Sequence, residues 1–262
     1  CGLYLRKTAY TDIVQKTTVP KRRADNMKKG KVIRIIILII LAAALVISGF
    51  KLITTLSRLS GEKNQIQKLA EETEQGENLF EKNSDMICWI DIEGTKISYP
   101  VMYTPNDPEH YLHRDFNGGY SYSGLPFLDS RCDIDKSSNL IIYGHNMKNS
   151  TMFSQLLNYE AYDFWKEHRY IDVKTKDGER KYEIIAAYRT KIQEKGSSAF
   201  RYYSFTDTDK ASEYDEYLRN IKKLALYDTG LSAEYGTQLM TLSTCSYHTE
   251  NGRFAVTAMR IE

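Results

Sequence analysis

The sequence is poor in cysteine, has almost no net charge and contains no internal repeats or low-complexity segments. Only 4 cysteines occur in 262 residues, and the three that follow Cys1, namely Cys88, Cys132 and Cys245, form an odd set. A complete disulfide framework is therefore excluded there, so the domain must rely on its apolar core and leave at least one thiol free. A formal net charge of +2 excludes a nucleic-acid-binding surface throughout the chain, and no nucleic-acid partner is predicted.

The small net charge hides an uneven distribution. Residues 1–34 contain ten Lys or Arg and two Asp, a balance of +8 that leaves −6 of the total of +2 for the rest of the chain. Residues 32–53 are apolar, interrupted only by Arg34 and Lys51. This length suits a transmembrane helix whose two cations reach the interfaces. Because cations precede the apolar run, we expect a single-pass membrane protein with a cytoplasmic N-terminus and residues 54–262 outside.

A buried core helix and a cleaved signal peptide are the alternatives for residues 32–53. Signal peptides have apolar regions of about 7–15 residues followed by a small-residue cleavage site, whereas this run is longer and no such site follows it. An uncleaved anchor is therefore favoured, with residues 1–31 as a basic cytoplasmic segment. Since Met27 opens "MKKGKVIRIIIL" as a natural anchor would begin, residues 1–26 are predicted not to be native.

Short apolar segments separated by turn residues predict a mainly β domain at residues 85–262. Asp177-Gly178 is the strongest hairpin signal, and Glu93-Gly94-Thr95 is a second one. Strands are expected at residues 88–92, 96–102, 125–130, 139–146, 170–175, 179–192, 238–243 and 254–262. About eight short strands favour a closed or nearly closed barrel, because closure leaves no exposed strand edges.

Helices are predicted between the strands and before them. Residues 152–168 read as one or two helices, and residues 209–226 form a helix with one apolar stripe made of Tyr214, Tyr217, Leu218, Ile221 and Leu224. Residues 54–84 are polar, with Ile66 and Leu69 three positions apart on a thin apolar edge. We interpret residues 54–84 as a helical stalk that packs on the barrel domain.

Most candidate reactive residues have an ordinary structural interpretation. Cys88 lies in an apolar strand, where a buried cysteine behaves as a small hydrophobe, and Cys132 is predicted to be an incidental thiol in a polar loop. His110 and His113 are predicted to pack on one helix face, because a zinc site needs three or four ligands and no matching pair stands nearby. The loop at residues 129–135 lacks the glycine and closing glutamate of a calcium site. No metal site is predicted.

Cys245 and His145 differ from these because each follows the end of an apolar strand. Two strand ends can converge on one rim of a barrel, and a Cys–His pair is the usual means of thiol catalysis. Arg253 begins the next strand, which is predicted to be antiparallel to the first, so it would lie beside Cys245. A guanidinium can donate two hydrogen bonds to the oxyanion of a tetrahedral intermediate. The alternative is a packed structural thiol in a membrane-tethered binding module.

Three segments resemble the sortase family, whose members are membrane-anchored cysteine transpeptidases of Gram-positive bacteria with an eight-stranded β-barrel. They are "TLSTC" with Arg253 eight residues later, "IIYGHN" upstream, and "YLHRDFNGGYSYSGLPFLDSR". The resemblance covers residues 77–262, and the N-terminal helical extension and the helix before the cysteine strand are similar to class B members. It implies that Cys245 is the nucleophile, His145 the general acid/base and Arg253 the oxyanion ligand, with Ser243 and Thr244 in the substrate groove.

The resemblance also implies a reaction and its partners. The enzyme would cleave a C-terminal sorting motif of secreted proteins after Thr through a thioester, and join the product to a peptidoglycan precursor amine of the lipid II type. No metal or organic cofactor is implied. Ser246 departs from the acidic residue that follows the cysteine in many class B members, which leaves the electrostatics of the substrate pocket open. NPQTN-like and (S/P)PxTG-like motifs are both left open.

Two enzymatic alternatives remain beside this interpretation. A cysteine endopeptidase would use the same Cys245–His145 pair with water as the acceptor, and a pilus-type polymerising sortase would use another protein's amine. The papain arrangement places Cys before His, the reverse of the order here, and the caspase signature around the cysteine is absent. A transpeptidase anchoring proteins to the cell wall is therefore the favoured function.

Overall fold

The computed structural model describes residues 21–75, 78–194 and 196–262 of the 262-residue chain. Two compact units divide the chain, Cys1–Ser57 and Arg58–Glu262. Residues 1–20, which hold most of the segment predicted not to be native, lie outside the described residues.

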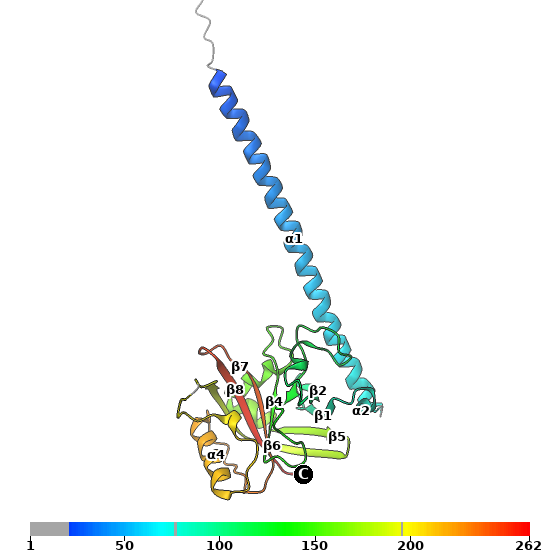
Figure 1. Ribbon diagram of the computed structural model, residues 1–262, viewed down its shortest axis with the longest axis vertical. Helices are drawn as coiled ribbons and strands as arrows, with labels where there is room; N and C mark the ends of the chain where they lie inside the picture. The colour runs from blue at the N-terminus through cyan, green and yellow to red at the C-terminus, as the bar shows by residue number, and fades with distance from the viewer. Residues whose placement is uncertain (1–20, 76–77, 195) are drawn as a thin grey trace, which may run out of the picture. The chain divides into compact units, whose positions relative to one another are not determined.

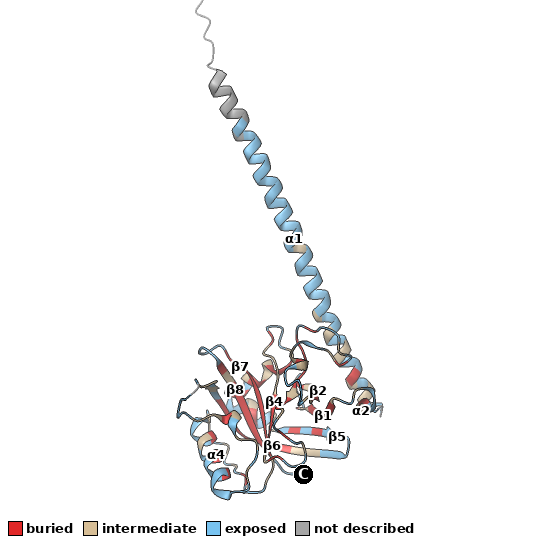
Figure 2. Cartoon of the chain, viewed as in Figure 1, coloured by how far each residue is buried: buried red, intermediate tan, exposed pale blue. Residues whose placement is uncertain are grey.

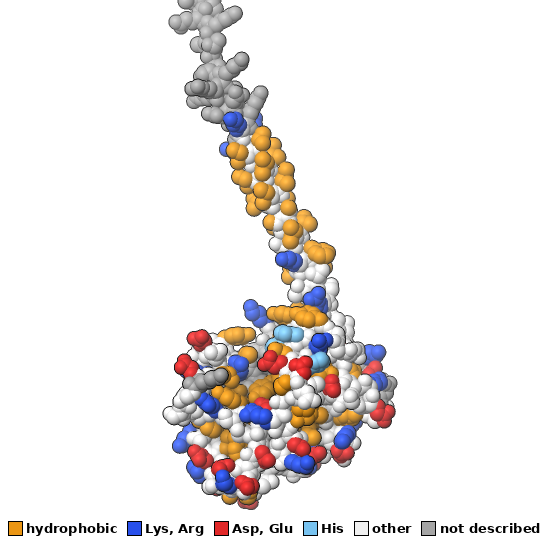
Figure 3. Space-filling model, viewed as in Figure 1, with side chains coloured by type: hydrophobic (Ala, Val, Ile, Leu, Met, Phe, Trp, Pro, Cys, Tyr) orange, Lys and Arg blue, Asp and Glu red, His pale blue; other side chains and the backbone are white. Residues whose placement is uncertain are grey.

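The first unit consists, where described, of the N-terminal part of a long helix, α1 (Lys21–Glu74). The large apolar side chains between residues 32 and 53 are all exposed, and Figure 3 shows them gathered along the visible side of this helix. Among the residues that the structure describes, α1 is the one helix long and apolar enough to cross a membrane. That length and composition fit a membrane anchor and also a signal sequence near the N-terminus.

The second unit is built around a closed barrel, which confirms the predicted fold (Figure 1). Its strands are β1 (Met86–Asp91), β2 (Ser98–Met102), β3 (Phe127–Leu128), β4 (Asn139–Tyr143), β5 (Tyr170–Thr175), β6 (Gly178–Lys191), β7 (Leu239–Cys245) and β8 (Gly252–Arg260). They follow one another around the barrel in the order β1-β2-β3-β4-β7-β8-β6-β5. Closure pairs every strand on both sides, so no long edge is exposed.

Both predicted hairpins are present. β5 and β6 pair antiparallel up to Thr175 opposite Gly178, beside the Asp177-Gly178 turn. β1 and β2 also pair antiparallel, and Gly94 in their connection has a φ of 77°, which favours glycine. Local turn chemistry thus sets the register of these two strand pairs.

Two parallel pairings depart from this local pattern. β2 pairs parallel with β3 at a single position, and β4 pairs parallel with β7 along its whole length, from Asn139 opposite Leu239 to Tyr143 opposite Ser243. Every residue of β4 except Tyr143, and every residue of β7 except Cys245, is buried. Such near-continuous burial is typical of parallel strands that are covered on both faces.

Short helices fill the connections between the strands. They are α2 (Leu79–Lys82), η1 (His110–His113), η2 (Phe153–Glu160), α3 (Tyr162–Glu167), η3 (Tyr202–Ser204) and α4 (Ala211–Leu224), where η marks a 3₁₀ helix. The predicted helical region at residues 152–168 is therefore two elements. In α4 the predicted stripe is buried except for Leu224, which is 38% exposed. Leu224 ends the helix, after which the chain returns to β6 through Ala225, which pairs with Tyr188.

The barrel interior contains two of the cysteines. Cys88 is fully buried, as predicted, and burial raises its pKa to about 12. Cys132 lies in a loop, as predicted, but the sequence did not indicate that it is 1% exposed and belongs to the core cluster. A turn precedes Cys132, whose N–H donates to the Asp129 carbonyl. The buried Cys132 thiol donates to the Asn139 carbonyl. Burial raises the pKa of Cys132 to about 11.

The last turns of α1 pack against the outside of the barrel within the second unit (Figure 2). Leu69 is 7% exposed, with Ile66 partly buried beside it. They belong to a cluster, termed here the helix–barrel cluster, that includes Leu69, Leu79, Met86, Trp89, Met102, Tyr111, Phe116 and Leu125. The apolar edge predicted for residues 54–84 thus contacts the domain that it precedes.

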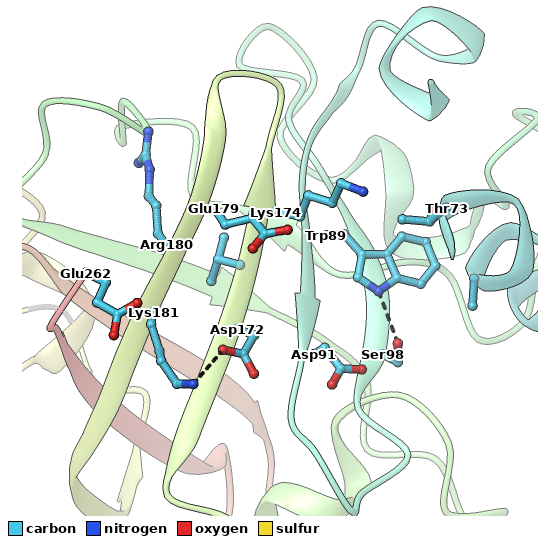
Figure 4. Close-up of a pocket in the computed structure, with 12 residues that line it drawn as sticks. Thr73, Trp89, Asp91, Ser98, Asp172, Lys174, Glu179, Arg180, Lys181 and Glu262 are labelled. Carbon is cyan, nitrogen blue, oxygen red and sulfur yellow. Dashed lines mark hydrogen bonds and ion pairs between the residues drawn. The ribbon is translucent and has the colours of Figure 1, made fainter. Parts of the chain in front are cut away.

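The outer face of β1, β5 and β6 has a hollow of about 390 Å³ (Figure 4). Trp89 there donates its indole N–H to the Ser98 hydroxyl at 3.1 Å, and Lys181 pairs with Asp172 at 3.4 Å. Opposite charges on neighbouring strands balance one another on this face. Its lining shares no residue with the groove described next.

Candidate active site

Three strand ends bring the predicted catalytic residues to one place. The antiparallel pairing of β7 and β8 puts Cys245 opposite Arg253, as predicted. The parallel pairing of β4 with β7 is continued by the Gly144 N–H, which donates to the Ser243 carbonyl at 3.1 Å. His145 therefore leaves β4 at the same level at which Cys245 ends β7.

All three side chains line one groove of about 590 Å³. Its other walls come from the chain around η1, from β3 and the turn after it, and from the long connection between β6 and β7. The residues that line it are Pro108, Glu109, Leu112, Phe127, Asp129, Ser130, Arg131, Tyr143, Gly144, His145, Ile192, Tyr203, Ser243, Thr244, Cys245 and Arg253. Among the described residues, no cluster of three or more His, Cys, Asp or Glu side chains could hold a metal ion.

The half-buried ring of His145 is held by a backbone carbonyl. Its Nε2 lies 2.9 Å from the Leu112 carbonyl oxygen. A carbonyl can only accept a hydrogen bond, so Nε2 carries the proton and Nδ1 keeps its lone pair in the neutral ring. Burial lowers the pKa of His145; the Leu112 carbonyl opposes this effect, and the neighbouring His113 adds to it. The ring therefore gives up its second proton more readily than free histidine does.

Cys245 is a free, half-buried thiol on a fixed backbone. The Asn146 side-chain amide donates to the Cys245 carbonyl at 2.8 Å. On one side, Thr244 Oγ1 donates to the Gly144 carbonyl at 2.7 Å, and on the other the Ser246 N–H donates to the Gly252 carbonyl at 3.0 Å. Hydrogen bonds from both neighbouring strands thus position the backbone that carries the thiol.

Ser243 and Thr244 line the groove, but their hydroxyls already have partners within the protein. Ser243 Oγ is 2.6 Å from the Tyr202 hydroxyl, and the Thr244 hydroxyl binds Gly144 as described. Both residues are almost completely buried, at 1% and 2% exposure. Their role in binding a substrate stays a prediction.

Arg253 faces the groove, and most of its N–H donors have no partner among the residues that the structure describes. Its Nη1 donates to the Gly252 carbonyl at 3.0 Å. Within the described part of the chain, no carboxylate lies at ion-pair distance from this guanidinium. A planar cation with free N–H groups beside a thiol is suited to stabilise a developing oxyanion.

Gly144 is required by close packing rather than by an unusual backbone conformation. A Cβ atom at this position would lie 2.6 Å from the ring of Phe153. Phe153 begins η2 and donates its N–H to the His145 carbonyl at 2.9 Å. The glycine therefore lets β4 end against η2 and deliver His145 to the rim.

A polar network in the wall of the groove was not predicted from the sequence, where Asp129 was considered only as part of a possible calcium loop. Arg131 Nη2 and Asp129 Oδ2 form an ion pair at 2.7 Å, and the Tyr143 hydroxyl donates to the same carboxylate at 2.9 Å. Arg131 also donates to the Tyr203 carbonyl at 2.6 Å. Burial raises the pKa of Asp129, but these hydrogen bonds outweigh burial and the pKa lies below its ordinary value. No sequence pattern links these four residues.

Taken together, the rim has the groups that cysteine-dependent acyl transfer requires: a thiol, an imidazole with a defined tautomer and a guanidinium with free donors. Residues 90–261 match the sortase domain family. The chain therefore belongs to the sortase family, and it is a cysteine transpeptidase of the class B-like kind.

Class B relatives match most of the chain. Sortase B of Staphylococcus aureus strain NCTC 8325 is 27% identical over 242 residues, which are 87% of this chain and 96% of that protein. A Staphylococcus aureus sortase B–substrate complex has a TM-score of 0.67 at 26% identity, covering 78% of this chain and 98% of that one. A sortase B complexed with triglycine has a TM-score of 0.69 at 27% identity, with the same coverage of 78% and 98%.

Proposed function

We propose that this class B-like sortase cleaves a C-terminal sorting signal of secreted proteins after Thr and joins the new carboxyl group to an amine of the cell wall. The observation that carries the proposal is the pairing of Cys245 with Arg253 beside His145 in one groove. The S. aureus relative was solved as a substrate complex, which supports a peptide occupying the corresponding groove here.

In the proposed first step, the Cys245 thiolate attacks the carbonyl carbon of the substrate Thr. The electron pair of that carbonyl moves to its oxygen, which becomes an oxyanion beside Arg253, whose free N–H groups donate to it. When the tetrahedral intermediate collapses, the C–N bond breaks and His145 gives its proton to the leaving amine. The products are a Thr thioester on Cys245 and the released C-terminal peptide.

The proton is exchanged at Nδ1 of His145. Because the Leu112 carbonyl holds the proton of Nε2, Nδ1 takes the proton of the thiol and later delivers it to the leaving amine. Burial lowers the pKa of the ring, which makes its protonated form a stronger acid toward that amine. In the second step the nitrogen of the attacking amine forms a bond to the Thr carbonyl carbon and gives a proton to the same Nδ1. The C–S bond then breaks, so that an amide is formed and Cys245 leaves as the thiolate.

The acceptor is proposed to be an amine of a peptidoglycan precursor of the lipid II type. A relative complexed with triglycine supports an amine-bearing peptide as the acceptor. The apolar helix is proposed to anchor the chain through residues 32–53, with the N-terminus in the cytoplasm and the barrel on the extracellular face. Secreted substrates and lipid-linked precursors both reach that face.

The experiment that tests this function uses the full chain in detergent micelles. Quenched fluorescent peptides with NPQTN-like and (S/P)PxTG-like motifs are incubated with and without triglycine or a diamine, and the products are identified by mass spectrometry. We expect one motif class to be cleaved after Thr with the amine joined to that Thr, and Cys245→Ala to give no product. Cleavage that never captures an amine would instead establish an endopeptidase.

Cys132→Ala is the matched control, because it removes a thiol that is 1% exposed and lies outside the groove. This variant is expected to retain turnover, with a lower melting temperature from the lost core contacts. Turnover by Cys245→Ala at the wild-type rate would reject the proposed nucleophile.

A further inference from the structure

His113 lies in the middle of a stack of side chains that ends at His145. The rings of His113 and His145 are 5.4 Å apart and inclined by 25°. On its other side, His113 stacks on Tyr120 at 6.3 Å and 24°, and the Arg58 guanidinium lies 5.7 Å from the centre of the Tyr120 ring. His113 is exposed and does not line the groove. Its contact with His145 is therefore not a consequence of core packing.

The backbone around η1 determines where this ring lies. Gly124, with a φ of 57°, passes so close that a Cβ atom there would lie 2.3 Å from the Leu112 carbonyl oxygen. The Leu125 N–H donates to the Tyr111 carbonyl and the Ser121 N–H donates to the His113 carbonyl, both at 3.0 Å. Together these contacts hold η1 against the loop that follows it.

That loop is in turn tied to the end of α1 that belongs to the second unit. The Glu62 carboxylate accepts the N–H groups of Tyr122 at 2.7 Å and of Ser123 at 3.3 Å. The loop also carries Tyr120, the ring on which His113 stacks. The position of His113 thus depends on several backbone contacts and not on its own side chain alone.

His145 consequently has two different contacts with the η1 segment. The Leu112 carbonyl binds the edge of the ring at Nε2, whereas His113 covers one face of it. A hydrogen bond at one edge still allows the ring to tilt about that bond, and a flat partner on its face opposes the tilt. Nδ1, the atom proposed to exchange the proton, moves most in such a tilt.

We propose that His113 is a positioning residue, whose ring holds the His145 imidazole in the orientation that proton exchange between Cys245 and the peptide amine requires. This inference rests on the proposed function of the same site. It assigns His113 no contact with the substrate. It predicts that a flat ring at position 113 matters more for kcat than a positive charge there.

The charge of His113 adds a separate, measurable effect. Two imidazolium rings 5.4 Å apart repel one another, and the neighbouring His113 accordingly contributes to the lowered pKa of His145. Cys245 and Arg253 lie in the groove with His145, and Glu109 lines it at the start of the η1 segment. On the His113 side, Arg114 donates to the Gly118 carbonyl and Arg58 lies over Tyr120. Removing the His113 charge leaves these other groups in place.

Two substitutions separate the ring from the charge. His113→Phe keeps a flat ring without a charge, and His113→Ala removes both. With a peptide that the wild-type chain turns over, we expect His113→Ala to lose about tenfold in kcat with little change in KM, because Nδ1 is no longer held in line. His113→Phe should keep kcat within about threefold of wild type. The limb of its kcat/KM pH profile that belongs to His145 should move to higher pH, because a neighbouring charge that lowers the pKa of His145 is gone.

His110→Ala is the matched control from the same 3₁₀ helix. The His110 imidazole binds Asp107 at 2.9 Å and stands outside the groove, so its removal should leave kcat and the pH profile unchanged. Nitrogen NMR of the imidazole rings in the full chain gives a readout independent of turnover. We expect His145 to be the Nε2–H tautomer in wild type and in both His113 variants, because the Leu112 carbonyl still holds that proton, and its ring signals to broaden only in His113→Ala, where the ring is free to tilt.

Wild-type kcat and unbroadened His145 ring signals in His113→Ala would overturn the inference, as would equal losses of kcat in His113→Phe and His113→Ala. Either result leaves the proposed function intact provided that Cys245→Ala is inactive in the same assay. Turnover by Cys245→Ala would instead reject the proposed function itself. The two failures are therefore distinguishable.

Discussion

At the scale of single residues, the shape of the Arg253 cation is expected to matter as much as its charge. Its guanidinium offers several N–H donors to the groove and uses one for the Gly252 carbonyl. Lysine would supply a compact ammonium that cannot present two parallel donors to an oxyanion. Arg253→Lys should therefore lower kcat by about 100-fold, a typical loss for one oxyanion donor, with KM for the peptide much less affected. Steady-state kinetics with the cleaved peptide measures both.

Arg260→Lys is the control on the same strand, β8. Arg260 is exposed and donates to the Glu262 carbonyl at 2.7 Å, away from the groove. Its substitution should change neither kcat nor the melting temperature appreciably. If Arg253→Lys folded normally and its kcat were within about threefold of the wild-type value, Arg253 would have no part in stabilising the oxyanion.

The residues around Arg253 show which positions in the site can be predicted from the sequence and which cannot. Cys245 and Arg253 were predicted to adjoin because a short turn joins their strands, so the register is a local property. Placing His145 beside them needed the parallel pairing of β4 with β7, whose residues lie one hundred positions apart. The Leu112 carbonyl has no signature in the sequence, because every residue has a carbonyl. The burial of Cys132 was not predicted, because its polar neighbours concealed the turn that precedes it.

At the scale of elements, the Asp129 carboxylate connects three parts of the groove. Through Arg131 and Tyr143 it links the turn after β3 to β4, and Arg131 also reaches the chain at Tyr203. Asp129 is 9% exposed, so loss of its charge leaves Arg131 without its partner. We expect Asp129→Asn to reduce the free energy of unfolding by about 1–3 kcal/mol at pH 7, the range for hydrogen bonds to charged groups.

The pH dependence of this loss follows from the lowered pKa of Asp129. A depressed carboxyl pKa stabilises the fold above the unfolded-state value of about 4, and the stabilisation disappears as pH falls through the folded-state pKa. The difference in the free energy of unfolding between wild type and Asp129→Asn should thus be constant from pH 5 to pH 7. It should become smaller in stronger acid. Urea unfolding at several pH values measures it. The control is Asp163→Asn, which breaks an exposed ion pair with Lys166 and should have almost the wild-type free energy of unfolding at every pH. If both variants lost the same stability, Asp129 would contribute no more to the fold than an exposed carboxylate does.

At the scale of the whole molecule, the catalytic unit includes more than the barrel. The compact unit begins at Arg58, and the residues of α1 within it contact both the helix–barrel cluster and the loop that carries Tyr120. Sequence periodicity showed the apolar edge at Ile66 and Leu69 but could not identify its partner. The partner consists of residues from β1, η1 and the loop after it, which come together only in the folded barrel. The same contacts support η1, and hence the carbonyl that binds His145.

Leu69 provides the test of this whole-molecule arrangement. It is 7% exposed in the helix–barrel cluster, so Leu69→Ala in the full chain should lower the free energy of unfolding of the barrel by about 2–4 kcal/mol through lost contacts and a cavity. Gly61→Ala, on an exposed turn of the same helix with no atom within 4 Å of a new Cβ, should instead stabilise by about 0.5–1 kcal/mol through helix propensity. Urea unfolding followed by the near-UV signal of the barrel tryptophans measures both. If Leu69→Ala left that transition unchanged, residues 58–75 would be a spacer and the barrel would fold without them. A loss of stability accompanied by a lower kcat would show that this helical segment supports the site as well as the fold.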